Sequence, residues 1–206
     1  MIDKESLIIS LHEMGAVQFG EFKLRSGDIS PVYLDLRLLV DRPAVLRRVA
    51  HMMQALAANL TFDRLAAIPM AGLPIGVALS LTMDKPLIYP RPREKDYGIS
   101  RYIEGTYKPG DTVLVIDDVV SRAHSKLEAL RLLEAVHLKV TDLIVVVDRQ
   151  MGGAEILEAR GYRVHHVLTL QEILDTLLAL GHMSEERHRF ISAWLEESRS
   201  SNRYAP

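Results

Sequence analysis

Cysteine is missing from all 206 residues of the chain. Disulfide bonds, catalysis by a thiolate and zinc sites built from cysteine are therefore excluded. The formal net charge is only −2, so no basic field indicates a nucleic-acid partner. The charged start, residues 1–6, lacks the apolar core of a signal peptide, and no apolar run reaches the roughly 18 residues of a membrane span. We therefore expect a cytoplasmic protein with no nucleic acid and no membrane among its partners.

Short apolar runs alternate with helical patterns along most of the chain, and hydrophobic residues make up 48% of it. Such alternation predicts an α/β fold with a mostly parallel central sheet and flanking helices. We expect a single domain, residues 1–206, with a small amino-terminal hood at approximately 1–40. The predicted strands are 19–27, 32–36, 65–68, 86–89, 112–116, 143–147 and 162–168. The predicted helices are 3–15, 43–60, 74–82, 125–136, 154–160, 170–180 and 184–198.

Residues 112–126 form the most informative segment of the sequence, a predicted strand, an acid pair, a loop and the start of a helix. The apolar, mostly β-branched start of this segment is typical of a buried strand in a parallel sheet. Asp117 and Asp118 follow at the carboxyl end of that strand, where ligands of open α/β sheets bind. A polar loop then leads to Ser125, the predicted cap of a helix whose free N–H groups attract phosphate. The pattern predicts binding of a ribose diol and a phosphate, and ordinary acids at a helix entry are the alternative.

Glycine is missing from the loop after the acid pair, although a tight anion-binding turn normally uses it. Arg122, Ala123 and His124 stand there instead, between the hydroxyl groups of Ser121 and Ser125. We expect the arginine to add positive charge and the serines to add hydrogen-bond donors. The loop is therefore a candidate phosphate site of unusual composition.

Another polar segment, residues 91–101, is basic and has no periodicity. A loop of this length in a compact domain is functional or disordered. It is either a mobile lid that brings Arg91 and Lys95 to an anionic ligand or a solvated surface loop. A second charged pair, Asp148 and Arg149, follows the strand predicted at 143–147, and it shares a row with the acid pair if the strands are parallel.

Several motifs together resemble one family. The acid pair and its loop resemble the phosphoribosyl diphosphate (PRPP) motif of the type I phosphoribosyltransferases. Residues 22–37, 88–105 and 147–162 resemble the hood, the catalytic loop and the orotate-side segment of the orotate phosphoribosyltransferases within that family. The resemblance implies a type I phosphoribosyltransferase fold. It also implies transfer of the 5-phosphoribosyl group from PRPP to orotate, giving orotidine 5′-monophosphate and diphosphate in pyrimidine synthesis.

The same resemblance implies roles for the matching residues in binding PRPP. The ribose hydroxyls would be held by Asp117 and Asp118, which are the expected catalytic residues together with Lys95. The 5′-phosphate would lie against Val119, Val120, Ser121, Arg122, Ala123, His124 and Ser125. The diphosphate end would meet Arg91, Pro92, Lys95 and Tyr97.

Orotate and the remaining partners are implied in the same way. Orotate would contact Arg25, Tyr33, Ser121 and Arg149. The carboxylate of orotate would pair with the guanidinium of Arg149. Mg²⁺ would arrive with the diphosphate and water, with at most Asp117 or Asp118 as a protein ligand. The resemblance also implies a homodimer in which loop 91–104 crosses to the neighbouring subunit.

Three positions depart from the family pattern. Ala123 replaces the loop glycine, Pro92 replaces a lysine, and Arg25 replaces another lysine. Two alternatives therefore stay open beside transfer to orotate. One is a phosphoribosyltransferase for another base, which would not need Arg149. The other is a catalytically weakened or inactive homologue that binds PRPP or a nucleotide.

Overall fold

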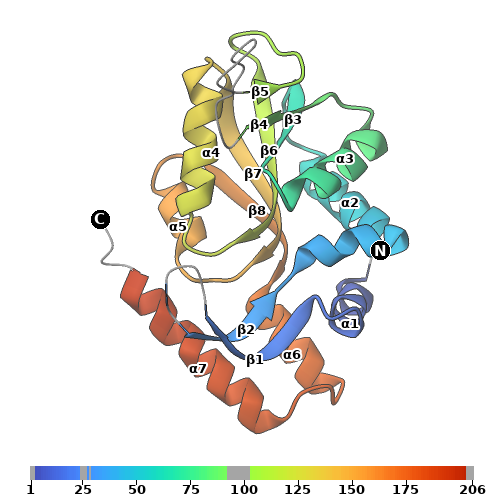
Figure 1. Cartoon of the computed structure of the whole chain (residues 1–206), viewed down its shortest axis with the longest axis vertical. Coiled ribbons are helices and arrows are strands. Elements are labelled where there is room, and N and C mark those ends of the chain that lie inside the picture. The colour runs from blue at the N-terminus through green and yellow to red at the C-terminus, as the bar shows by residue number, and fades with distance from the viewer. Residues whose placement is uncertain (1–2, 24–26, 28, 92–102, 203–206) are drawn as a thin grey trace.

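The computed structural model describes residues 3–23, 27, 29–91 and 103–202 (Figure 1). In this part of the chain, a six-stranded sheet has the order β5-β4-β3-β6-β7-β8. All neighbours pair in parallel except β5, which is antiparallel to β4. The predicted mostly parallel sheet is confirmed. The strands are β3 (Arg64–Ala67), β4 (Leu87–Pro90), β5 (Ile103–Glu104), β6 (Thr112–Val120), β7 (Lys139–Asp148) and β8 (Arg163–Thr169).

Helices cover both faces of this sheet (Figure 1). Alternation along a strand sends neighbouring side chains to opposite faces. Leu114 and Ile116 of β6 therefore join the core beneath α2 and α3, whereas Val113 and Val115 join the core beneath α4 and α5. Burial on both faces explains why β6 is a nearly continuous apolar run. The four helices are α2 (Pro43–Ala57), α3 (Gly72–Met83), α4 (His124–Ala135) and α5 (Gly153–Glu158).

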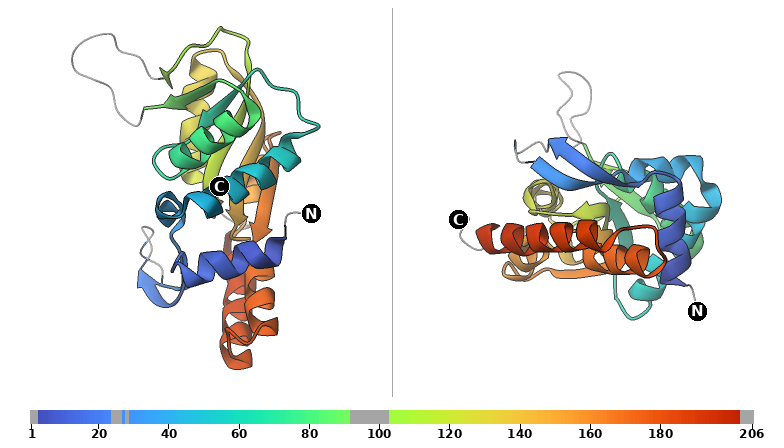
Figure 2. Two further views of the ribbon diagram at one scale, coloured as in Figure 1. Left: turned by 90° about the vertical axis from the view of Figure 1, so that its right-hand side faces the viewer. Right: turned by 90° about the horizontal axis from the view of Figure 1, so that it is seen from below.

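The amino-terminal elements lie at one end of the sheet (Figure 2). They are α1 (Lys4–Glu13), the antiparallel hairpin β1 (Val17–Lys23) and β2 (Ile29–Leu34), and a 3₁₀ helix, η1 (Leu36–Asp41). The last two helices, α6 (Leu170–Ala179) and α7 (Glu185–Asn202), pack beside them, with α6 against α1 and α7 against β2. Elements from the amino-terminal and carboxyl-terminal parts of the chain therefore pack against each other at this end of the sheet.

The structure shows side-chain caps on α1 and α6 and contradicts the cap predicted at Ser125. Asp3 accepts N–H bonds at the start of α1, and Thr169 forms a complete capping box on α6. The predicted cap at Ser125 is wrong, because α4 already begins at His124 and its capping residue is Ala123, in a left-handed conformation. In the described ranges, no helix is both long and apolar enough to cross a membrane.

Candidate active site

The acid pair lies within β6 rather than after it. The strand continues to Val120, and Asp117 pairs in register with Val145 of β7. The sequence placed the end of this strand at residue 116, which is four residues too early. Because successive side chains alternate, Asp117 is buried while Asp118 is half-buried.

Asp117 forms a buried ion pair with Lys126 on the first turn of α4. The Lys126 Nζ lies 2.6 Å from Asp117 Oδ2, and the two side chains are only 9% and 5% exposed. The other oxygen, Oδ1, accepts the N–H of Asp118 at 2.8 Å. Burial raises the pKa of Asp117 to about 7, and the charge of Lys126 opposes that rise. Lys126 was not among the predicted site residues, because no local pattern in the sequence indicates a contact between these two residues.

Gly72 allows the start of α3 to approach this acid. A Cβ at this position would lie 2.9 Å from the carbonyl oxygen of Ile116 and 3.0 Å from Oδ1 of Asp117. Any side chain would therefore displace the helix from the strand. The glycine in this strand-to-helix turn serves close packing of the two elements.

The loop after β6 leads directly into the N-terminus of α4. The first intrahelical bond of α4 runs from Leu127 N–H to the Ala123 carbonyl, at 2.9 Å. The N–H groups of residues 124–126 therefore have no acceptor within the helix, and the positive end of the helix dipole lies there. Ala123 has φ 65°, so it adopts the backbone conformation expected for glycine. This arrangement can bind an anion without a glycine in the loop.

A cavity of about 470 Å³ brings most of the predicted phosphate loop together with Arg149. Lys126, Glu128 and Met151 also line it. Val120 does not, because its side chain is buried in the core beneath α4. The predicted residues that line the cavity are Val119, Ser121, Arg122, Ala123, His124, Ser125 and Arg149.

Arg149 enters this cavity from the end of β7 and is 7% exposed. One terminal nitrogen donates to Ser30 Oγ at 3.0 Å and to the Val32 carbonyl at 3.3 Å. Among the residues that the structure describes, none accepts a hydrogen bond from its Nε, and none pairs a carboxylate with it. Burial, followed by the nearby charge of Arg122, lowers the pKa of Arg149 to about 10. A buried guanidinium that lacks an anion favours a ligand that carries one.

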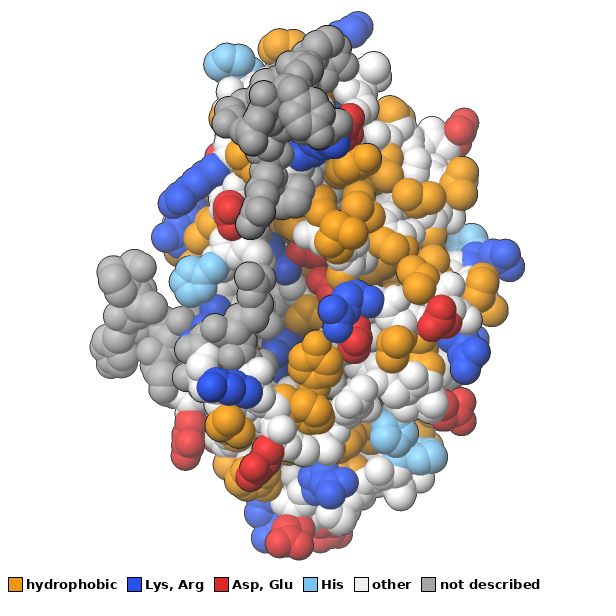
Figure 3. Space-filling view, in the orientation of Figure 1, with side chains coloured by type: hydrophobic (Ala, Val, Ile, Leu, Met, Phe, Trp, Pro, Cys, Tyr) orange, Lys and Arg blue, Asp and Glu red, His pale blue; other side chains and the backbone are white. Residues whose placement is uncertain are grey.

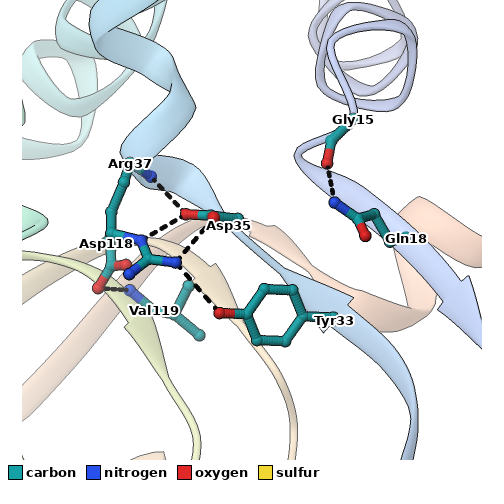
Figure 4. Close-up of polar contacts among 7 residues, drawn as sticks. All are labelled: Gly15, Gln18, Tyr33, Asp35, Arg37, Asp118 and Val119. Atoms are coloured by element: carbon teal, nitrogen blue, oxygen red, sulfur yellow. Dashed lines mark hydrogen bonds and ion pairs between the residues drawn. The ribbon is translucent and has the colours of Figure 1, made fainter. Parts of the chain in front are cut away.

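Tyr33 belongs to a different polar cluster on the hood (Figure 4). Its ring stacks on Phe22 with the centroids 5.4 Å apart, and its hydroxyl accepts a bond from Arg37 at 3.2 Å. Asp35 holds Arg37 with two bonds, from Nε at 2.6 Å and from Nη2 at 2.8 Å. The bond from Arg37 is the main reason that the pKa of Asp35 is lowered. Tyr33 is not among the residues that line the cavity, so its predicted role toward the base stays a prediction.

Arg91 lies just after β4 and pairs with Glu104 of β5. Its Nε is 2.8 Å from Glu104 Oε1, and both side chains are about one-third exposed. A diphosphate at this arginine would compete with that carboxylate. The other residues predicted to meet the diphosphate or orotate, Arg25, Pro92, Lys95 and Tyr97, lie outside the described residues.

Comparison with known proteins assigns the chain to a family. The phosphoribosyl transferase domain family matches residues 38–162. The chain belongs to the phosphoribosyltransferase family. An orotate phosphoribosyltransferase of Caenorhabditis elegans is 37% identical to it, over 94% of this chain and 86% of the relative. The uridine 5′-monophosphate synthase of Bos taurus is 40% identical, over 94% of this chain and 41% of the relative.

A solved structure supports the same relationship. The UMP synthase of Leishmania donovani superposes with a TM-score of 0.87 at 38% identity, covering 94% of this phosphoribosyltransferase and 42% of the larger chain. The chain thus spans about two-fifths of the length of the UMP synthases it matches. It spans most of the Caenorhabditis elegans relative. The resemblance to orotate phosphoribosyltransferases, drawn from its motifs, is confirmed.

Proposed function

We propose that this phosphoribosyltransferase transfers the 5-phosphoribosyl group of PRPP to orotate, releasing diphosphate and forming orotidine 5′-monophosphate. The observation that carries the choice of base is Arg149, a buried cation without a carboxylate partner among the described residues. It lines the same cavity as the phosphate loop. Orotate carries a carboxylate that a guanidinium can bind in a bidentate manner, whereas uracil and the purine bases carry none.

In the proposed reaction, a ring nitrogen of orotate forms a bond to C1′ of PRPP. The bond between C1′ and the diphosphate oxygen breaks, its electron pair leaves on diphosphate, and the nitrogen's proton passes to solvent. The chain contributes by holding the two reactants in line and by placing charge where it develops. The helix N-terminus of α4 and Ser121 would hold the 5′-phosphate, Arg149 would hold the base, and Asp118 would bind the ribose hydroxyls.

Mg²⁺ fits this site as a companion of PRPP. Within the described ranges, no three histidine, aspartate or glutamate side chains gather around a point that could hold a metal ion. Asp117 is engaged by Lys126, whereas Asp118 is half-buried and one of its oxygens accepts the Val119 N–H, at 2.7 Å. Asp118 would therefore approach Mg²⁺ directly or through water, and the ion would neutralise the diphosphate.

We further propose that the protein is a homodimer that buries the exposed face of α3. This helix is mostly apolar, and its Val77 and Leu81 are 49% and 81% exposed. Met70, in the preceding loop, is 74% exposed. Figure 3 shows hydrophobic side chains gathered over this part of the molecule. Apolar patches of this kind mark protein interfaces, and a second copy of the chain is the partner that the proposal requires. That loop 91–104 crosses to this partner stays a prediction.

The test of the proposed reaction is release of diphosphate from PRPP by the purified chain with Mg²⁺ and either orotate, uracil or adenine. Of the three bases, we expect only orotate to be turned over. Arg149→Met should lower kcat/KM for orotate about 10- to 150-fold, because a hydrogen bond to a charged group contributes about 1.5–3 kcal/mol. Arg131→Met, which removes an exposed arginine of α4, is the matched control and should leave kcat/KM unchanged.

Each other outcome counts against a defined part of the proposal. No diphosphate release with any base, beside an active enzyme assayed in parallel, would overturn the catalytic function. It would favour a chain that only binds PRPP. Equal turnover of orotate and adenine would overturn the choice of base. Sedimentation as a monomer at micromolar concentration, or a dimer unchanged by Leu81→Lys, would overturn the proposed interface.

A further inference from the structure

The loops after β6 and β7 touch through their backbones. Arg149 N–H donates to the Val120 carbonyl at 2.9 Å, which joins the two chain segments where the strands end. Farther along, Gly153 opens α5 directly against the phosphate loop. A Cβ on Gly153 would lie 2.3 Å from the Ser121 carbonyl oxygen, 2.7 Å from its carbon and 3.0 Å from Ala123 N. These are backbone atoms, so no side-chain rotation can relieve the overlap.

We propose that Gly153 is a positioning residue that sets where the phosphate loop lies. Its missing side chain lets the first turn of α5 rest against residues 121–123, which keeps the N–H groups at the start of α4 in place. This proposal deepens the proposed function, because it concerns the loop assigned there to the 5′-phosphate. Gly153 itself would touch no substrate.

The contact also joins the two ends of the substrate site. Arg149 begins the segment that ends at Gly153, and the segment includes Gln150 and Gly152, both in left-handed conformations. Gln150 is held by its carbonyl, which accepts from Arg199 of α7, and by its side chain, which accepts from Gln171 N–H. A segment anchored in this way can support the loop that it touches. The distance between the phosphate site and Arg149 therefore depends on the Gly153 contact.

The test is Gly153→Ala, with Gly20→Ala as the matched control. Among the described residues, a Cβ at Gly20 meets only the Phe22 ring, at an ordinary contact distance of 3.5 Å, so that variant should behave as the parent protein. We expect Gly153→Ala to raise the KM for PRPP at least about tenfold while kcat falls much less, because the displaced loop binds the phosphate poorly. A fall in kcat with an unchanged KM for PRPP would overturn the proposal.

A second substitution that restores PRPP binding would distinguish displacement of the loop from a general loss of folding. Ala123→Gly, in the same loop, restores backbone freedom at φ 65° and lets the loop adapt to a side chain at residue 153. We expect the double variant to regain most of the affinity for PRPP. A double variant that is no better than Gly153→Ala would contradict the proposal.

Two further measurements test the proposal if transfer to orotate fails or if Gly153→Ala does not fold. Calorimetry with ribose 5-phosphate reports the phosphate loop without any turnover, so the proposal can be tested even if transfer to orotate fails. If Gly153→Ala does not fold, the amide signal of Gly153 in the unaltered protein serves instead. We expect it to shift, and its hydrogen exchange to slow, when ribose 5-phosphate binds. An amide that stays unchanged at saturation would overturn the inference.

Discussion

Replacing Lys126 by methionine isolates the charge that accompanies Asp117. The variant keeps the length of the side chain but removes the ammonium 2.6 Å from Asp117 Oδ2. The expected consequence is a further rise in the pKa of Asp117, which burial already raises from 3.8 to about 7. At an effective dielectric constant near 20, a cation at about 4 Å contributes up to roughly 4 kcal/mol. We therefore expect a rise of about one to three pKa units.

The raised pKa determines how stability depends on pH. A carboxyl group whose pKa is higher in the folded state stabilises the fold below its unfolded pKa, and this contribution is lost as pH rises through the folded pKa. In the parent protein this contribution is lost as pH rises through about 7, whereas in Lys126→Met the loss continues to higher pH. The two proteins should differ by less than about 1 kcal/mol at pH 6. At pH 9 the variant should be less stable by roughly 2–3 kcal/mol, at about 1.4 kcal/mol for each pH unit.

The assay is urea denaturation at pH 6, 7, 8 and 9, together with a pH profile of diphosphate release. The acid limb of the activity profile should move upward with the pKa of Asp117. Lys126→Arg keeps the charge and should reproduce the parent profile, and Lys139→Met removes an exposed lysine and should change neither measurement. A stability loss in Lys126→Met that is the same at pH 6 and pH 9 would refute the reasoning. It would mean that Lys126 acts through packing.

Three further changes have defined outcomes. Ala123→Gly should leave the free energy of unfolding unchanged or raise it by up to about 1 kcal/mol, because glycine adopts the left-handed conformation of residue 123 without strain. A fall of about 1 kcal/mol in the free energy of unfolding, as for this substitution in an ordinary helix, would contradict the prediction. Glu104→Gln should release Arg91 from its ion pair and lower the Kd for diphosphate, measured by calorimetry, about two- to fivefold. An exposed ion pair contributes about 0.5–1 kcal/mol. Weaker binding of diphosphate would contradict the prediction. Thr169→Ala should lower the free energy of unfolding by about 0.5–2 kcal/mol through the lost helix cap, with kcat/KM unchanged. A fall in kcat/KM would contradict the prediction, because it would show that the cap also contributes to the active site.

Most of the fold was predictable because it depends on local patterns. The apolar run at residues 112–116 indicated a buried strand, and the spacing in α2 indicated one buried face, which includes Val49 and Met53. Local chemistry also accounts for the caps at Asp3 and Thr169, whose side-chain oxygens accept backbone N–H bonds. Prediction failed where the tertiary structure overrides local preference. The two-residue strand β5 forms only because Ile103 pairs with Pro90 of β4, and a segment of that length has no periodicity to detect.

The phosphate loop shows the same limit. Ser125 is a good capping residue by type, yet α4 begins one residue earlier with Ala123 as its cap. The same loop packs against Gly153, where an added Cβ would lie 2.3 Å from the Ser121 carbonyl oxygen. That contact joins segments that follow different strands, so no window of sequence contains it.

The sequence by itself determined the alternation of strands and helices, the position of the acid pair and the family resemblance, because each depends on residue type at short spacing. Only the tertiary structure showed that Asp117 is buried and paired with Lys126, and that Arg149 is buried without a carboxylate among the described residues. The physical reason is that burial and charge pairing arise from elements that meet across the sheet edge. The strengths of those interactions depend on the distances and the exclusion of water that folding creates.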